Sequence, residues 1–160
     1  MNAIYVGEFN PPNNLDKKII ENVLNNKICK TQLDIKNIYI IPEYINESNN
    51  SLKYNFNDRV NLCKDFFKNN NNIIVSDICG LVQNKNFLEL FEYLKNNKTD
   101  ISNNFYIIFD ISKFEKILNN NIYRNILEDM HVILIGNEDD NRFHIYKTMS
   151  LIRYAFLLEK

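Results

Sequence analysis

The sequence predicts a doubly wound α/β domain, with a five-stranded parallel sheet, helices on both faces and a C-terminal helix. Short apolar runs of strand length alternate with segments of helical period, and asparagine-rich breaks separate them. The apolar runs are continuous, which is typical of strands that are buried on both faces. Strands that alternate with helices imply right-handed crossovers, and therefore a parallel sheet.

Five segments rich in β-branched and aromatic residues are the expected strands. They span residues 2–6, 37–42, 73–77, 104–109 and 131–135. Between and after them, apolar residues recur every three or four positions, which predicts helices. These helices span residues 15–28, 58–68, 86–94, 112–127, where the asparagines at 119–121 interrupt the pattern, and 150–159.

The 160-residue chain has the length of one ordinary domain, and no linker or internal repeat divides residues 1–160. A formal net charge of -1 gives no electrostatic bias toward nucleic acid or anionic membranes. The sequence contains no run of roughly 20 apolar residues and no basic-then-apolar start, so we expect a soluble, cytoplasmic protein.

The cysteines and histidines do not suggest a metal site. Cys29, Cys63 and Cys79 are widely spaced and form no C-x-x-C pair. We expect them to be small buried hydrophobes in a reducing compartment. His131 and His144 have no paired Cys, Asp or Ser motif, and therefore support neither metal nor triad chemistry.

The stretch VGEFNPPNNLDKKII, residues 6–20, lies where a ligand site is expected. In doubly wound sheets, ligands bind outside the carboxyl ends of the strands. Gly7 directly follows the first strand and allows the backbone to approach a ligand closely. Pro11 and Pro12 fix a turn before a helix whose first N–H groups point back at it. This arrangement suits phosphate binding.

The G-E-F-N-P-P of Gly7 to Pro12 resembles the G-x-F-N-P-P that opens nicotinate-nucleotide adenylyltransferases. These enzymes belong to the nucleotidyltransferase superfamily and have a Rossmann-like fold. The resemblance continues in order along the chain. It includes Pro42, Lys53 and Arg59, which are similar to the proline after the family's second strand, its loop lysine and the arginine of its next helix. The segments VSDI at 75–78 and YIIFD at 106–110 resemble its third and fourth strands. TMSLIR at 148–153 is similar to the family's I-S-S-T-x-I-R.

The departures from the family pattern concern its phosphate-holding residues. Where the family has H-x-G-H, this chain has Asn13, Asn14, Leu15 and Asp16. A carboxylate at Asp16 would repel a nucleotide phosphate from the helix start, but it could instead cap its own helix, the reading that we favour. The family's S-Y-T is replaced by Asn86, Phe87 and Leu88, and the Asp of the same helix by Leu90. Phe109 stands where the family has the glycine of its fourth strand.

The resemblance implies a set of site residues. The backbone of Gly7, Glu8, Phe9 and Asn10 would hold ATP, and Asn13 with Lys17 or Lys18 would replace the histidine contacts. Ser150 and Arg153 would hold the distal phosphates from the start of the C-terminal helix. Lys53 and Arg59 would recruit the anionic end of the substrate.

The implied reaction is transfer of AMP from ATP, with Mg²⁺, to nicotinate mononucleotide. Two alternatives stay open: a catalytically impaired relative that binds nucleotides or proteins, and a nucleotidyltransferase with another acceptor. If the protein is inactive, no cofactor is expected, and no resident metal site is expected in either case. We expect no nucleic-acid or membrane partner, and a homo-oligomer stays open.

Two further segments are candidates for a role. Residues 43–57 look like a surface loop long enough to be functional. Asp139 and Asp140 follow Gly136 and could bind a cation, although a solvated acidic turn is the favoured interpretation.

Overall fold

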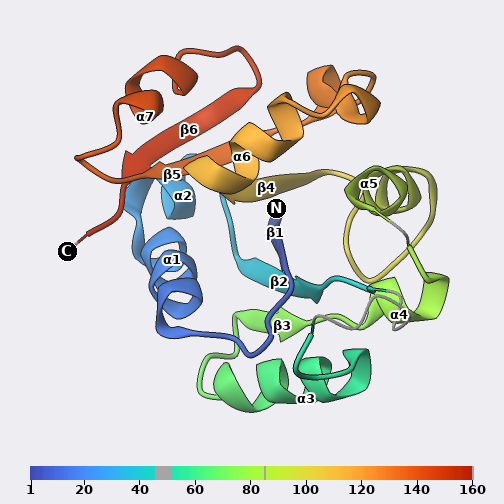
Figure 1. Ribbon diagram of the computed structural model, residues 1–160. Coiled ribbons are helices and arrows are strands. Elements are labelled where there is room, and N and C mark those ends of the chain that lie inside the picture. The colour runs from blue at the N-terminus through green and yellow to red at the C-terminus, as the bar shows by residue number, and fades with distance from the viewer. Residues whose placement is uncertain (46–51, 85, 160) are drawn as a thin grey trace.

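Six parallel strands form one sheet in the computed structural model, which describes residues 1–45, 52–84 and 86–159. The strand order is β3-β2-β1-β4-β5-β6 (Figure 1). The strands are β1 (Asn2–Gly7), β2 (Asn37–Pro42), β3 (Ile73–Val75), β4 (Phe105–Asp110), β5 (Val132–Gly136) and β6 (Ile152–Leu157).

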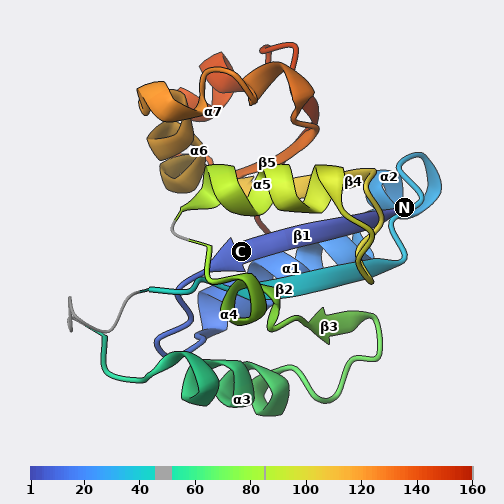
Figure 2. The same ribbon diagram turned by 90° about the vertical axis from the view of Figure 1, so that its right-hand side faces the viewer.

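The helices cover both faces of this sheet. They are α1 (Asn14–Asn25), α2 (Lys27–Thr31), α3 (Phe56–Phe66), α4 (Ile78–Val82), α5 (Phe87–Asn96), α6 (Ile111–Leu118) and α7 (Asn141–Tyr146), with 3₁₀ turns at Asn121–Tyr123 and Leu127–Asp129. Figures 1 and 2 show α1 and α5 on opposite faces.

The alternation of side chains along β1 explains the two layers. Ala3 and Tyr5 pack with the apolar residues of α1 and with cysteines of α2 and α3, whereas Ile4 and Val6 pack with α4, α5 and α6. Successive strand side chains point to opposite faces, so a strand that is apolar throughout is buried on both sides. The predicted doubly wound α/β fold is therefore confirmed.

The expected C-terminal helix at 150–159 was wrong, and so was the count of five strands. Residues Ile152–Leu157 form β6, which pairs in parallel with β5, with a register irregularity at Val132/Ile133. Leu151, Ile152, Ala155 and Leu158 fit a helical spacing, which is why the segment reads as a helix. The segment forms a strand because the open edge of β5 offers backbone hydrogen-bond partners to this half-buried stretch.

The helix expected over 112–127 ends at Leu118, where the asparagines begin, as the interruption indicated. The segment expected at 15–28 is divided between α1 and α2 at Asn26, whose side chain caps α2 by accepting from the Cys29 N–H. The short helices α4 and α7 were not predicted.

All three cysteines are free and buried, as expected. Burial raises the pKa of each thiol to about 12, so they are poor nucleophiles at neutral pH. Among the described residues, no helix is both long and apolar enough to span a bilayer.

Candidate active site

A cleft of about 1530 Å³ opens at the carboxyl ends of β1 and β4. The strand order reverses between these two strands, because β2 and β3 lie on one side of β1 and β4, β5 and β6 on the other. Such a reversal is where doubly wound sheets bind their ligands. The walls come from the turn at 7–11, the first turn of α1, the residues after β2, α5, α6 and the 3₁₀ turn after α6.

The turn after β1 allows almost no extra atoms. A Cβ added to Gly7 would lie 3.3 Å from Phe9 Cζ and 3.4 Å from Lys113 Nζ. Phe9 itself has a φ of 50°, an unusual value for a residue with a side chain, and its ring is buried. Gly7 therefore lies in the cleft wall with the Phe9 ring and the Lys113 ammonium packed against it.

Arg59 of α3 fastens this turn to the rest of the fold. Its side chain is fully buried and donates to the Glu8 carbonyl (2.7 Å) and to the Tyr54 carbonyl (3.3 Å). The Tyr54 N–H in turn donates to Asn10 Oδ1 at 2.9 Å. Burial lowers the pKa of Arg59, although the nearby Glu43 and Glu8 oppose that shift. Arg59 therefore shapes the cleft without lining it.

Asp16 caps its own helix, as the favoured interpretation of the sequence stated. Asn13 Oδ1 accepts from the Asp16 N–H, and Asp16 Oδ2 accepts from the Asn13 N–H, which is a reciprocal capping box. The other carboxylate oxygen, Asp16 Oδ1, accepts from the Tyr5 hydroxyl at 2.9 Å. Both oxygens are therefore engaged, although the residue still contributes to the cleft wall.

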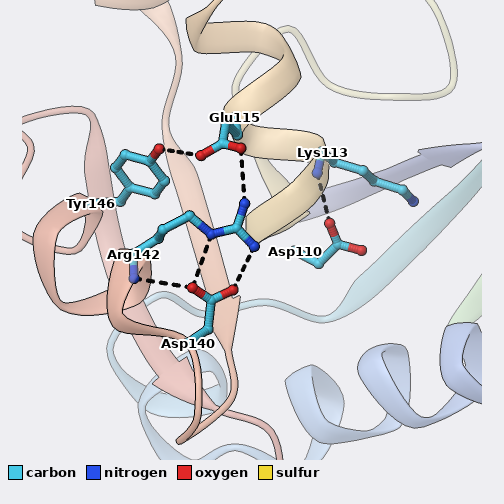
Figure 3. Close-up of polar contacts among 6 residues, drawn as sticks. All are labelled: Asp110, Lys113, Glu115, Asp140, Arg142 and Tyr146. Carbon is cyan, nitrogen blue, oxygen red and sulfur yellow. Dashed lines mark hydrogen bonds and ion pairs between the residues drawn. The ribbon is translucent and has the colours of Figure 1, made fainter.

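Lys113 places a cation at the end of β1. Its helix, α6, begins directly after β4, and Asp110 caps it by accepting from the Lys113 N–H. The Lys113 ammonium donates to the Val6 carbonyl at 3.0 Å and lies 4.0 Å from the centroid of the Tyr5 ring. Figure 3 shows this side chain extending away from the polar group around Arg142.

The charges around Lys113 act in opposite directions on its pKa. Burial lowers the pKa of this ammonium, while Asp110, Asp16 and Glu43 raise it and Lys116 lowers it. Glu43 also lines the cleft, and its N–H donates to the Gly7 carbonyl. Burial and the neighbouring Glu8 raise the pKa of Glu43.

Three aromatic side chains that contact one another line the cleft. The Phe87 ring lies 5.8 Å from that of Phe109 and 6.0 Å from that of Tyr123, measured between centroids. Asn84, which is 8% exposed, also lines the cleft, and its Oδ1 has no hydrogen-bond partner among the residues that the structure describes. An apolar wall with few polar atoms suits a planar ring that carries a hydrogen-bonding substituent.

The comparison with curated proteins gives a relative that matches most of the chain. The probable nicotinate-nucleotide adenylyltransferase of Fusobacterium nucleatum subsp. nucleatum is 31% identical over 152 residues, and the match covers 89% of this chain and 71% of that protein. The chain belongs to the nicotinate-nucleotide adenylyltransferase family. No family model matches the chain.

Several solved structures share the fold of this chain. Plasmodium falciparum nicotinic acid mononucleotide adenylyltransferase complexed with NaAD matches with a TM-score of 0.72 and 16% identity, over 98% of this chain and 73% of that one. Its complex with APC gives a TM-score of 0.69 and 17% identity, over 98% and 72% of the two chains. A putative nicotinate-nucleotide adenylyltransferase from Vibrio parahaemolyticus matches with a TM-score of 0.58 and 21% identity, over 83% and 75%.

The structure brings some of the residues implied by the family resemblance to the cleft. These are Gly7, Glu8, Phe9, Asn10 and Asn13. Lys17 and Lys18 do not line it, and the Lys17 ammonium lies 5.7 Å from the ring of Phe66 on α3. Lys53 is exposed, with its ammonium 5.3 Å from the Tyr54 ring. Of the expected loop at 43–57, residues 46–51 lie outside the described residues.

Ser150 and Arg153 lie at the other end of the sheet. Arg153 follows the first residue of β6. Burial and the nearby Arg153 lower the pKa of His131, which directly precedes β5. Because the strands are parallel, both residues are near the amino ends, whereas the cleft is at the carboxyl ends. Ser150 begins no helix, so a phosphate site at a helix start does not form there.

The acidic turn after Gly136 has a structural role. Asp140 caps α7 and accepts from Arg142 Nη2 at 2.7 Å, while Arg142 Nη1 donates to Glu115 Oε1 at 2.8 Å (Figure 3). The Tyr146 hydroxyl donates to Glu115 Oε2. This polar cluster of Glu115, Asp140, Arg142 and Tyr146 joins α6 to α7. His144 on α7 is exposed and does not line the cleft.

Sequence reasoning missed Tyr5, Glu43 and Lys113. One signal pointed to the lysine: Asp110 ends an apolar strand, and Lys113 follows three residues later, which is the spacing of a helix cap and its third residue. No local signal indicated that this lysine reaches β1, because the contact depends on β1 and β4 being neighbours.

Proposed function

We propose that this protein transfers AMP from ATP, bound with Mg²⁺, to nicotinate mononucleotide. The observation that carries the proposal is the cleft at the strand-order reversal, with the Gly7–Pro11 turn in its wall. Its volume, about 1530 Å³, exceeds that of a typical small-molecule pocket, which leaves room for two nucleotides.

The transfer forms one bond and breaks one. A phosphate oxygen of nicotinate mononucleotide attacks the α-phosphorus of ATP and forms the new P–O bond. The bond from the α-phosphorus to the oxygen of the β-phosphate breaks, and its electron pair leaves with pyrophosphate. The protein aligns the two phosphates and stabilises the charge that develops, which is where most phosphoryl-transfer catalysis comes from.

Mg²⁺ would come to the cleft with the nucleotide. Among the described residues, no group of three or more His, Cys, Asp or Glu could hold a metal ion by itself. Mg²⁺ usually takes one or two protein carboxylates together with substrate phosphates and water. Glu8 and Glu43 line the cleft beside the turn and would supply those oxygens.

A second candidate function is nucleotide binding without transfer, and one observation favours it. Among the described residues that line the cleft there is no histidine, and the carboxylates of Glu8, Asp16 and Glu43 are accompanied there by two lysines, Lys113 and Lys116. Removal of one preorganised donor from a charge-stabilising site costs roughly 10²–10³ in rate. A transferase with another acceptor would bind ATP in the same cleft.

The test is a pyrophosphate-release assay with ATP, Mg²⁺ and nicotinate mononucleotide, with identification of the dinucleotide product. The proposal predicts stoichiometric pyrophosphate and dinucleotide. Binding of ATP without release of pyrophosphate would contradict the proposal and support the binding module. Release only with a different mononucleotide would support the other acceptor.

A further inference from the structure

We propose that Lys113 is the catalytic cation of the cleft, and that it contacts the phosphate chain in place of a cation on α1. This inference rests on the proposed function. The motif at the start of α1 carries Asn13 and Asp16 and no positive group that lines the cleft. The positive charge instead comes from α6 on the neighbouring strand, β4.

The position of the Lys113 ammonium fits a phosphate contact. It lies at the carboxyl end of β1, where it donates to the Val6 carbonyl and sits 3.4 Å from the point that a Cβ at Gly7 would occupy. An ammonium group has three N–H donors, and that carbonyl takes one. A ligand that reaches the Gly7 backbone therefore also reaches the ammonium.

The Tyr5 ring holds the ammonium in place while Asp16 stays engaged elsewhere. The ring lies under the Lys113 ammonium at 4.0 Å, and its hydroxyl donates to Asp16 Oδ1. With Asn13 on its other oxygen, Asp16 forms no direct ion pair with Lys113 among the described residues. The acid that replaces a family histidine therefore leaves the lysine able to pair with a ligand.

The other cations near this end of the fold are less well placed. Arg59 is fully buried and committed to two backbone carbonyls. Lys17 and Lys18 do not line the cleft, and Lys116, one turn further along α6, is exposed at its wall. Among the described cations, Lys113 thus combines contact with β1 and a place in the cleft.

The surroundings of Lys113 make its charge sensitive to a phosphate. Asp110, Asp16 and Glu43 favour the ammonium form, whereas burial and Lys116 disfavour it. The phenol of Tyr5, whose ring also lies against the ammonium, stays protonated because burial and Asp16 raise its pKa. A bound phosphate adds negative charge beside Nζ and should raise the pKa of Lys113.

The experiment is calorimetric titration with α,β-methylene-ATP and Mg²⁺, an analogue that cannot transfer AMP. Lys113→Gln removes the charge, Lys113→Arg keeps it, and Lys64→Gln removes an exposed lysine of α3 outside the cleft. Loss of a charge-assisted contact should weaken binding about 10- to 100-fold in Lys113→Gln, with partial recovery in Lys113→Arg and no change in Lys64→Gln.

Equal affinity of wild type and a folded Lys113→Gln would overturn the inference, and so would absence of binding by the wild type at millimolar analogue. If Lys113→Gln does not fold, the pH dependence of wild-type binding decides. Affinity should fall as Lys113 deprotonates, at a pH below that of an exposed lysine, and a flat profile up to the denaturation limit would overturn the inference.

The two proposals fail in distinguishable ways. Binding that depends on Lys113 without pyrophosphate release contradicts the proposed transfer and leaves the lysine's role intact. Transfer with binding that does not depend on Lys113 contradicts only the inference.

Discussion

Helix α6 separates two groups of charged residues that differ in how completely they are paired. On one side, Glu115 accepts from both Arg142 and Tyr146, and Asp140 completes the polar cluster. On the other side, Lys113 donates to a single carbonyl and faces carboxylates without a direct ion pair among the described residues. The first group is saturated by the protein itself, whereas the second retains capacity for a ligand.

This difference distinguishes charged residues that stabilise the fold from a charged residue that can bind a ligand. A closed ion-pair cluster on the surface has donors and acceptors matched in number and position, so it gains nothing from a further group. A partly buried cation with spare donors, at the edge of an open cleft, gains most from an anion. The following experiments change residues around Lys113 first, then the residues that hold the turn and Asp16 in place, and last the polar cluster.

The largest effect is expected for Gly7→Val. A valine would project methyl groups from a Cβ that already lies 3.3 Å from Phe9 and 3.4 Å from the Lys113 ammonium. It would displace the Phe9 ring or the Lys113 ammonium, and we expect at least about a tenfold loss of affinity for α,β-methylene-ATP by calorimetry. Gly7→Ala should have a smaller effect in the same direction. Unchanged affinity of Gly7→Val would show that the ligand does not approach this turn.

Arg59→Met should destabilise the fold by about 2–4 kcal/mol, because it removes charge-assisted hydrogen bonds to two backbone carbonyls. Urea unfolding, followed by circular dichroism, measures this loss. The matched control is Arg124→Met, which removes an exposed arginine after the 3₁₀ turn Asn121–Tyr123 and should leave the midpoint in place. Equal stability of the two variants would contradict the view that Arg59 anchors the turn after β1.

Tyr5→Phe deletes one hydroxyl and leaves the ring under Lys113. Asp16 Oδ1 loses its donor, and we expect a loss of about 1 kcal/mol in unfolding free energy. Tyr106→Phe, on the half-buried side chain of β4, is the control and should be neutral. Affinity for the analogue should also fall, since the freed Oδ1 of Asp16 can pair with the lysine. A gain in affinity would contradict this view of Asp16.

The smallest effect is expected for Arg142→Gln, and it depends on pH. Hydrogen bonds from Tyr146 and Arg142 hold the pKa values of Glu115 and Asp140 below their usual range. Groups with lowered folded-state pKa values contribute stability above the unfolded-state pKa values, near 4, and lose it as the pH falls through the folded-state values. The stability difference between wild type and variant should therefore shrink on acidification. A difference that grows toward low pH would contradict the assignment.

Local patterns in the sequence were sufficient to predict the first five strands and the helices α1, α3, α5 and α6, because continuous apolar runs and helical spacing act within one element. The capping role of Asp16 was also predictable, since its partner Asn13 lies three residues away. The edge strand β6 was not, because Leu151 to Leu158 fits both periods and only the free edge of β5 decides between them. Lys113 and Tyr5 meet across 108 positions of sequence, and nothing local to either indicates the contact.

The central claim is that the cleft at the strand-order reversal binds a nucleotide through the Lys113 ammonium. The most direct test follows the pH titration of the Lys113 side chain by NMR, with and without Mg²⁺ and α,β-methylene-ATP. We predict a pKa below that of exposed lysines in the free protein and a clear rise when the analogue binds, because the phosphate charge favours the ammonium. A Lys113 titration that the saturating analogue leaves unchanged would contradict the claim.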